Sequence, residues 1–287
     1  MTLTGPIVLL VLVGALLHAS WNALIKSGAD KPLDTALVNS FGVLLALPAV
    51  ALFGMPRLEA WPYLLGSMAI HIGYYIALAG AYRHGELGLT YPIMRGSAPL
   101  LVALGSASVV GEGLSLQGWL GVLAISGGVI AVGLSRTSML APGHRAAALR
   151  YAFANAAIIA TYTLVDGIGV RVSGDAPAYL AALFLFDGIP YLVLVLWRRG
   201  TSRRAALGYM RARWKLGLIG SLASVGSYSI ALWAMTRAPV AAVAALRETS
   251  VLFAALIGTL WLKESFGAQR AAGTVVIVAG VAALRFS

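Results

Sequence analysis

Charged side chains lie inside three long apolar stretches of the sequence. Arg95 belongs to "YPIMRGSAPLL", Arg247 and Glu248 belong to "ALRETSVLF", and Asp187 lies near the middle of another apolar run. A charge at mid-bilayer is costly and usually faces a partner or a wet cavity. We therefore expect these four residues to act in gating or ion coupling, with static ion pairing as the alternative. Because adjacent helical residues point about 100° apart, Glu248 need not pair with Arg247, and Asp187 could neutralise either arginine.

Aromatic and polar side chains also recur inside the apolar runs. His18 and Asn22 are four residues apart and therefore share one helix face. A lone polar residue in a span often only forms a hydrogen bond to a neighbouring helix, and this structural role is the alternative for each polar residue named here. We predict that eight of these residues bind a small solute: His18, Trp21, Asn22, His71, Tyr75, Tyr91, Tyr162 and Tyr228. One further stripe, in the run 149–169, consists of Tyr151, Asn155, Tyr162 and Asp166.

Motifs for covalent chemistry are absent from the sequence. Its four histidines are scattered, and it contains no HExxH, no GxSxG and no clustered carboxylates within an apolar run. The phosphate-binding pattern GxxxxGK[ST] is also missing, so direct use of ATP is not expected. With no cysteine, thiol chemistry is excluded as well. We predict that the chain is not an enzyme and requires neither a cofactor nor a metal.

The composition indicates that these side chains are positioned by membrane-spanning helices. The chain is 60% hydrophobic and 11% charged, whereas soluble domains carry about 25% charged residues. Apolar runs long enough to cross a hydrocarbon core of about 30 Å recur throughout, and none alternates like a barrel strand. We predict an all-α integral membrane protein with ten spans, at residues 5–26, 33–53, 61–82, 88–110, 117–134, 149–169, 176–198, 214–234, 240–262 and 268–286.

Basic residues concentrate on one side of the predicted membrane. The connections after the first, third, fifth, seventh and ninth spans carry most of the 21 Lys and Arg residues, and the other side carries only Arg57, Arg171, Arg237 and Arg285. The positive-inside rule places the rich side in the cytoplasm, so both termini are expected on the periplasmic side. The net charge of +11 is thus explained by basic residues in the cytoplasmic connections. The expected partner of the protein surface is the lipid bilayer, and no nucleic acid is expected.

The two halves of the sequence resemble each other. A shift of 152 residues aligns Arg95 with Arg247, and it also aligns Glu112 with Glu264, Gln117 with Gln269, Gly121 with Gly273 and Gly128 with Gly280. We predict two five-helix repeats, at 1–135 and 149–287, joined by a cytoplasmic linker at 136–148. Because five is odd, the second repeat enters the membrane from the opposite side. Carriers built from such inverted repeats hold their solute near mid-membrane between the halves.

Prolines surround the first of the two intramembrane arginines. Pro92 and Pro99 each remove a backbone hydrogen bond and crowd the carbonyl four residues earlier. Gly96 adds conformational freedom between them. We therefore expect the span 88–110 to bend there, with Pro92, Gly96 and Pro99 as a hinge beside the solute path.

The paired segments "GEGLSLQGWLGVLAISGGVI" (Gly111–Ile130) and "KESFGAQRAAGTVVIVAGVA" (Lys263–Ala282) resemble the EamA-type branch of the drug/metabolite transporter superfamily. Within that branch the chain most resembles bacterial aromatic amino-acid exporters of the YddG type. The resemblance implies export across the bacterial inner membrane by alternating access. The expected substrate is an amino acid, aromatic ones favoured and small neutral ones such as Thr included. Export of cationic drugs or other small metabolites is the alternative, and the resemblance leaves the oligomeric state open.

Overall fold

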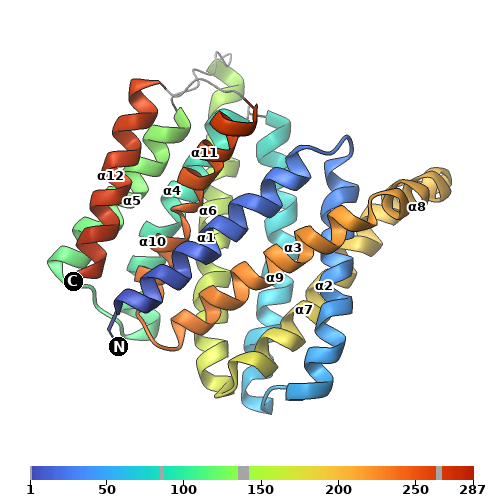
Figure 1. Cartoon of the computed structure of the whole chain (residues 1–287), viewed down its shortest axis with the longest axis horizontal. Helices are drawn as coiled ribbons and strands as arrows, with labels where there is room; N and C mark the ends of the chain where they lie inside the picture. Colours follow the sequence, from blue (N-terminus) through green and yellow to red (C-terminus); the bar gives the residue numbers. More distant parts are fainter. Residues whose placement is uncertain (1, 85–86, 135–141, 263–266) are drawn as a thin grey trace.

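The structure is a computed structural model that describes residues 2–84, 87–134, 142–262 and 267–287. Every regular element in these ranges is helical (Figure 1). The first half contains α1 (Gly5–Lys26), α2 (Lys31–Phe53), α3 (Trp61–His84), α4 (Leu87–Gly105) and α5 (Leu116–Leu134). The second contains α6 (Pro142–Ser173), α7 (Ala176–Arg198), α8 (Arg203–Ala212), α9 (Trp214–Met235), α10 (Val240–Arg247), α11 (Ser250–Leu262) and α12 (Ala268–Arg285).

Nine segments of the described ranges are long and apolar enough to cross a membrane. The prediction of an all-helical, multi-pass membrane protein is therefore confirmed. The remaining predicted span, 61–82, falls on the 24-residue helix α3, whose membrane crossing stays a prediction. Large apolar side chains project from the outside of the bundle, where lipid would cover them, among them Leu9, Leu44, Leu120, Val193, Ile219 and Leu260.

The starts of α2 and α7 use the same local signal. Asp30 and Asp175 precede these helices, and each side chain accepts a hydrogen bond from the backbone N–H three residues later. A proline follows in the first turn of each helix, where its missing N–H costs nothing. An acidic cap and a proline thus fix the point at which the chain re-enters the bundle.

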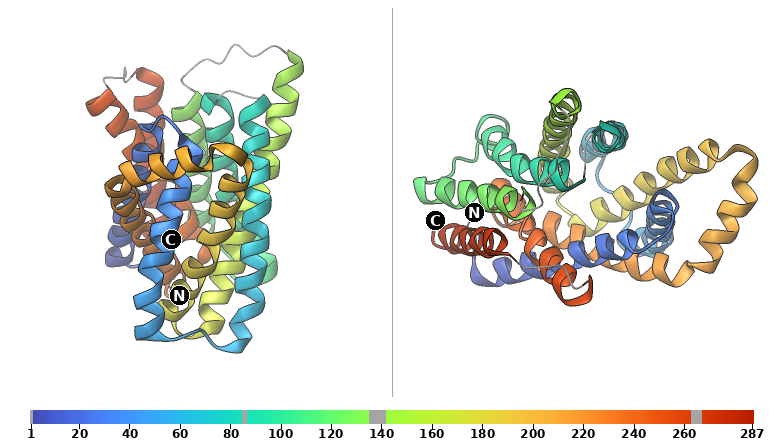
Figure 2. Two further views of the ribbon diagram at one scale, coloured as in Figure 1. Left: turned by 90° about the vertical axis from the view of Figure 1, so that its right-hand side faces the viewer. Right: turned by 90° about the horizontal axis from the view of Figure 1, so that it is seen from above.

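Helices from the two halves of the chain pack against each other. α5 lies beside α12, α2 beside α7, α3 beside α6, and α1 beside α9 (Figures 1 and 2). Both termini lie toward the lower end of the bundle in Figure 1. The core consequently forms between segments that are distant in sequence, and neither half is enclosed by itself.

The contact between α5 and α12 depends on glycine. A Cβ added to Gly128 would lie 2.8 Å from the carbonyl oxygen of Gly273, and one added to Gly121 would lie 3.0 Å from that of Gly280. Ile125 fills the space beside Gly280, and Ile277 fills the space beside Gly128. Small residues of this kind allow two spans to approach until their backbones touch.

Two spans are interrupted near Arg95 and Arg247, the arginines within the predicted spans. The span predicted at 88–110 continues from α4 into a π-helical turn, Ser106–Val110. The span predicted at 240–262 divides into α10 and α11 at Glu248 and Thr249. α4 itself remains helical through Pro92 and Pro99, and Gly96 lets it approach α5, since an added Cβ would lie 2.9 Å from the carbonyl oxygen of Ser126. The hinge role of these three residues stays a prediction.

Two connections contain more helix than expected. α6 already begins at Pro142, so the C-terminal part of the expected linker 136–148 is helical, while residues 135–141 lie outside the described ranges. The basic connection after α7 contains the ten-residue helix α8, which projects at one edge of the bundle (Figure 1). α8 packs on α2 and α7 through the buried side chains of Ala206 and Met210.

Candidate functional site

A cavity of about 170 Å³ lies between helices of both halves. The structure describes the side chains of seven of the eight predicted solute-binding residues, and all seven line it: His18, Trp21, Asn22, His71, Tyr91, Tyr162 and Tyr228. The side chain of Tyr75 lies outside the described part. Its neighbour Tyr74 lines the cavity, as do Asn39 and three serines of α9. The predicted polar faces of five helices therefore converge on one space.

Aromatic rings from several helices form part of the cavity wall. The imidazole of His71 stacks on the ring of Tyr162, with 4.4 Å between ring centroids. Tyr74 meets the same ring edge-on at 6.2 Å, and Trp21 meets His18 edge-on at 5.3 Å. Such walls offer flat π surfaces to planar groups and negative ring faces to cations.

Two of the predicted charged residues neutralise each other beside the cavity. Arg95 of α4 forms an ion pair with Glu248, which follows α10, with 2.8 Å between Nε and Oε2. Both residues are buried, at 7% and 4% exposure, and Arg95 Nη2 lies 3.3 Å from Nε2 of His18. The pair joins the two halves of the chain. The suggestion that Asp187 neutralises Arg95 is therefore wrong, because Glu248 occupies that position.

The other two charges face the cavity, where Arg247 remains within electrostatic range of Glu248. Arg247 lies over the ring of Tyr228, 4.9 Å from the centroid, and Asp187 of α7 lines the same space. Neither forms an ion pair with a residue that the structure describes. Among the residues that the structure describes, the guanidinium of Arg247, the carboxylate of Asp187 and several aromatic rings thus face the same cavity.

One buried carboxylate was not selected by the sequence analysis. Asp166 of α6 is 0% exposed, and both of its oxygens accept hydrogen bonds from phenols. Tyr228 donates to Oδ2 at 2.5 Å, and Tyr179 of α7 donates to Oδ1 at 3.0 Å. Its sequence signal was that it is the sole acidic residue of α6. The donors lie on other helices, so no spacing within α6 could have revealed them.

An ion pair lies at the end of the bundle at which the N-terminus lies. Glu112, after the π-helical turn, pairs with Arg171 at the end of α6, with 2.9 Å between the charged atoms. Glu112 also accepts a hydrogen bond from the backbone N–H of Val240, and Arg171 donates to the carbonyl oxygens of Met235 and Ala238. Three connections from both halves are thereby tied together.

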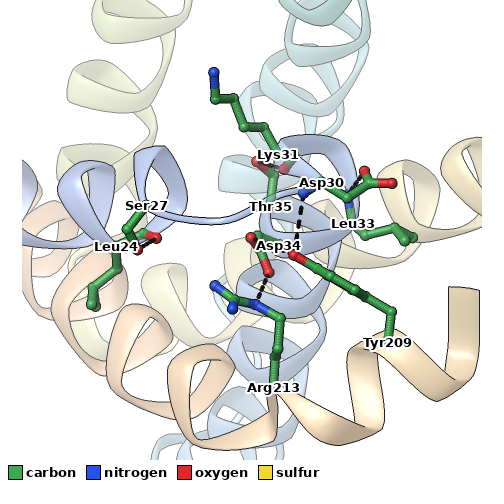
Figure 3. Close-up of polar contacts among 9 residues, drawn as sticks. All are labelled: Leu24, Ser27, Asp30, Lys31, Leu33, Asp34, Thr35, Tyr209 and Arg213. Atoms are coloured by element: carbon green, nitrogen blue, oxygen red, sulfur yellow. Dashed lines mark hydrogen bonds and ion pairs between the residues drawn. The ribbon is translucent and has the colours of Figure 1, made fainter.

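A second polar network lies at the opposite end (Figure 3). Asp34, at the start of α2, is 0% exposed and pairs with Arg213 at 2.8 Å. Tyr209 of α8 donates to the same carboxylate at 3.1 Å, and Arg199 pairs with Asp30 at 2.7 Å. The cavity therefore lies between two charged clusters that both cross from one half of the chain to the other.

Comparisons with known proteins agree with this architecture. Residues 147–286 match the EamA-like transporter family, and a search of curated proteins gave no match. A protein of known crystal structure superposes with a TM-score of 0.75 and 20% identity, over 99% of this chain and 98% of its own. At that identity the likeness concerns the fold alone. The C-terminal half of the chain is therefore similar to the EamA-like transporter family, which belongs to the drug/metabolite transporter superfamily and consists of membrane transporters rather than enzymes.

Proposed function

We propose that this transporter exports amino acids across the bacterial inner membrane, with aromatic ones favoured and small neutral ones such as Thr accepted. The observation that carries the proposal is the pair of available charges, Arg247 and Asp187, in one aromatic-walled cavity. An amino acid is a zwitterion, and its carboxylate and ammonium require one cation and one anion. Few other abundant small solutes match both charges at once.

Each end of an amino acid has a partner of suitable chemistry. A guanidinium can hold a carboxylate by two parallel hydrogen bonds, and an aspartate can accept hydrogen bonds from an ammonium. The aromatic rings remain for the side chain of the solute. The cavity of about 170 Å³ is smaller than typical ligand pockets of about 300–1,000 Å³, which favours a small solute over a bulky drug.

Alternating access follows from an inverted repeat, which the α5–α12 contact supports. The pair Gly121 and Gly280 becomes the pair Gly273 and Gly128 when 152 is added to the first number and subtracted from the second. Ile125 and Ile277 exchange in the same way. Contacts that map onto themselves under the shift are expected of halves related by a two-fold axis in the membrane plane. We take the repeats as 1–135 and 149–287, with the axis passing between α5 and α12.

The membrane orientation is part of the proposal. Both termini and the Glu112–Arg171 pair are assigned to the periplasmic side, and α8 with its arginines to the cytoplasmic side. Epitope tags at the two termini, probed in intact and permeabilised cells, test this assignment. Tags that lie on different faces of the membrane would contradict it.

Reconstituted flux tests the substrate. Liposomes that contain the protein are expected to take up labelled Phe, Trp or Thr saturably and above the leak of empty vesicles. Arg247→Gln should raise KM roughly tenfold to hundredfold, since a hydrogen bond to a charged group contributes about 1.5–3 kcal/mol. Arg237→Gln is the matched control, because Arg237 also lies over an aromatic ring, that of Trp233, but is exposed outside the cavity.

The alternative substrate class is cationic. Asp187 and the aromatic walls together could hold an amine without help from Arg247. Phenethylamine, which is phenylalanine without its carboxylate, separates the two classes. Uptake of the amine that equals uptake of Phe and is unaffected by Arg247→Gln would favour cation export, whereas a strong preference for Phe that disappears in Arg247→Gln supports the amino acid.

A further inference from the structure

We propose that Asp166 is a proton-binding site that communicates with the solute cavity through Tyr228 and His71. The predicted coupling groups were Asp187 and Glu248, but Glu248 is committed to Arg95 and Asp187 faces the cavity. Asp166 differs from both, because it is fully buried and forms no ion pair with any residue in the described ranges. The part of the proposal that concerns coupling rests on the proposed amino-acid transport.

The surroundings of Asp166 suit exchange between a charged and a neutral form. A buried carboxylate without a counter-ion is costly to keep charged, whereas two phenol donors can stabilise the charge when it is present. Tyr179 and Tyr228 supply these donors from α7 and α9. A hydroxyl can also accept a hydrogen bond, so one phenol can accept from the protonated acid while the other still donates to its carbonyl oxygen.

A route for the proton leads from the cavity to this acid. Tyr228 lines the cavity and contacts Asp166 directly through its hydroxyl. On α3, His71 lines the cavity too and lies close enough to Asp166 for their charges to interact, and its Nδ1 lies 2.9 Å from the carbonyl oxygen and 3.3 Å from the hydroxyl of Ser67. Phenol, hydroxyl and imidazole groups can each accept and release a proton. Proton exchange therefore does not require water to reach the buried carboxylate.

Tyr228 also connects the proton to the solute. Its hydroxyl donates a hydrogen bond to Asp166, and the guanidinium of Arg247 lies over its ring. Arg247 is the proposed partner of the solute carboxylate. Protonation of Asp166 removes the acceptor charge that orients this phenol, and so alters the surface on which Arg247 rests. By linkage, if protonation of Asp166 changes the affinity for the solute by some factor, solute binding changes the proton affinity of Asp166 by the same factor.

Other titratable groups surround the site and could produce a similar signal. They are Tyr162 on α6, His71 on α3, Asp187 and Tyr179 on α7, Tyr228 on α9, and Arg247 at the end of α10. The experiment must therefore assign the proton to one residue. Infrared difference spectroscopy does this, because a protonated carboxyl group has its own carbonyl band, distinct from that of carboxylate, imidazole and phenol.

The first measurement needs no solute. Purified protein titrated between acidic and alkaline pH is expected to show a protonated carboxyl band that disappears in Asp166→Asn and persists in Asp187→Asn. Tyr179→Phe, which deletes one donor, should move the pH midpoint of the band without removing it. A band that survives in Asp166→Asn, or a midpoint that is unchanged in Tyr179→Phe, would overturn the proposal.

The second measurement tests coupling with L-phenylalanine as the probe. Its addition to weakly buffered protein is expected to change the number of bound protons, read with a pH dye. The change should be lost in Asp166→Asn but retained in Arg237→Gln, because Arg237 is exposed outside the cavity. A change that is retained in Asp166→Asn would assign the proton to another group and overturn the proposal. If the infrared band is assigned to Asp166 but L-phenylalanine does not bind, the proposed substrate fails while the proton site stands.

Discussion

Burial of the ion pair between Arg95 and Glu248 removes both charges from water, and their close mutual attraction offsets this desolvation cost. Removing one partner of a buried pair leaves an uncompensated charge, which typically costs about 3–5 kcal/mol. We expect Arg95→Ala to lower the thermal stability of the protein in detergent and to slow exchange between access states, because the pair joins α4 to the α10–α11 break. Single-cysteine accessibility, convenient in a chain without cysteine, measures the exchange.

The double variant Arg95→Met/Glu248→Met provides the control for that prediction. Apolar residues of similar volume often replace a buried ion pair without loss of stability. The double variant should therefore recover the melting temperature that Arg95→Ala loses, while transport stays impaired. Full recovery of transport would assign the pair a purely structural role.

Asp187 is predicted to matter for transport more than for folding. Asp187→Asn keeps the volume of the side chain and removes the charge proposed to meet the solute ammonium. We expect membrane expression near that of the wild type, together with strongly reduced amino-acid flux. Wild-type flux in this variant would remove Asp187 from the mechanism.

The sequence indicated the importance of some individual residues but not of others. Arg95, Arg247 and Asp187 stand out because any charge within an apolar run is conspicuous. The pairing of Arg95 with Glu248 could not be read, because it depends on how α4 meets the α10–α11 break. Asp34 resembled an ordinary polar residue at a helix start, and only the approach of α8 and α9 buries it against Arg213.

Among the elements, α5 and α12 make a contact that is sensitive to added volume. We expect Gly128→Ala to destabilise the protein by about 1–3 kcal/mol, because the new methyl group would meet the backbone of α12. Gly127→Ala is the matched control, since an added Cβ there has no neighbour within 4 Å. Thermal unfolding followed by size-exclusion chromatography compares the two, and equal melting temperatures would contradict the prediction.

Helix positions were largely predictable, and interruptions were not. Lipid permits helices wherever an apolar run has the required length, so α1, α7 and α9 begin where the runs begin. The π-helical turn after α4 and the break at Glu248 depend on tertiary contacts that hold the released backbone groups. α8 was taken as part of a connection, because its ten residues are too few and too basic for a span.

For the whole molecule, the Glu112–Arg171 pair is predicted to hold one side closed. Val240, whose N–H contacts Glu112, is 0% exposed in this closed arrangement. A cysteine placed by Val240→Cys should react slowly with a membrane-impermeant thiol reagent, and Glu112→Gln in the same chain should accelerate the reaction by favouring the open state. Equal labelling rates would show that the pair does not control access from this side.

The polar network around α8 has a consequence for the balance between states. If the halves are related by the proposed two-fold axis, contacts such as α5–α12 contribute equally to both access states and cannot favour either. The connection equivalent to α8 in the first half, between α2 and α3, holds only the three-residue turn Leu58–Ala60. The preference for one resting orientation must therefore originate in unmatched contacts, of which Tyr209 to Asp34 is one. Substitutions in α8 alone could therefore change which side of the membrane the empty carrier faces, without changing the residues that line the solute cavity.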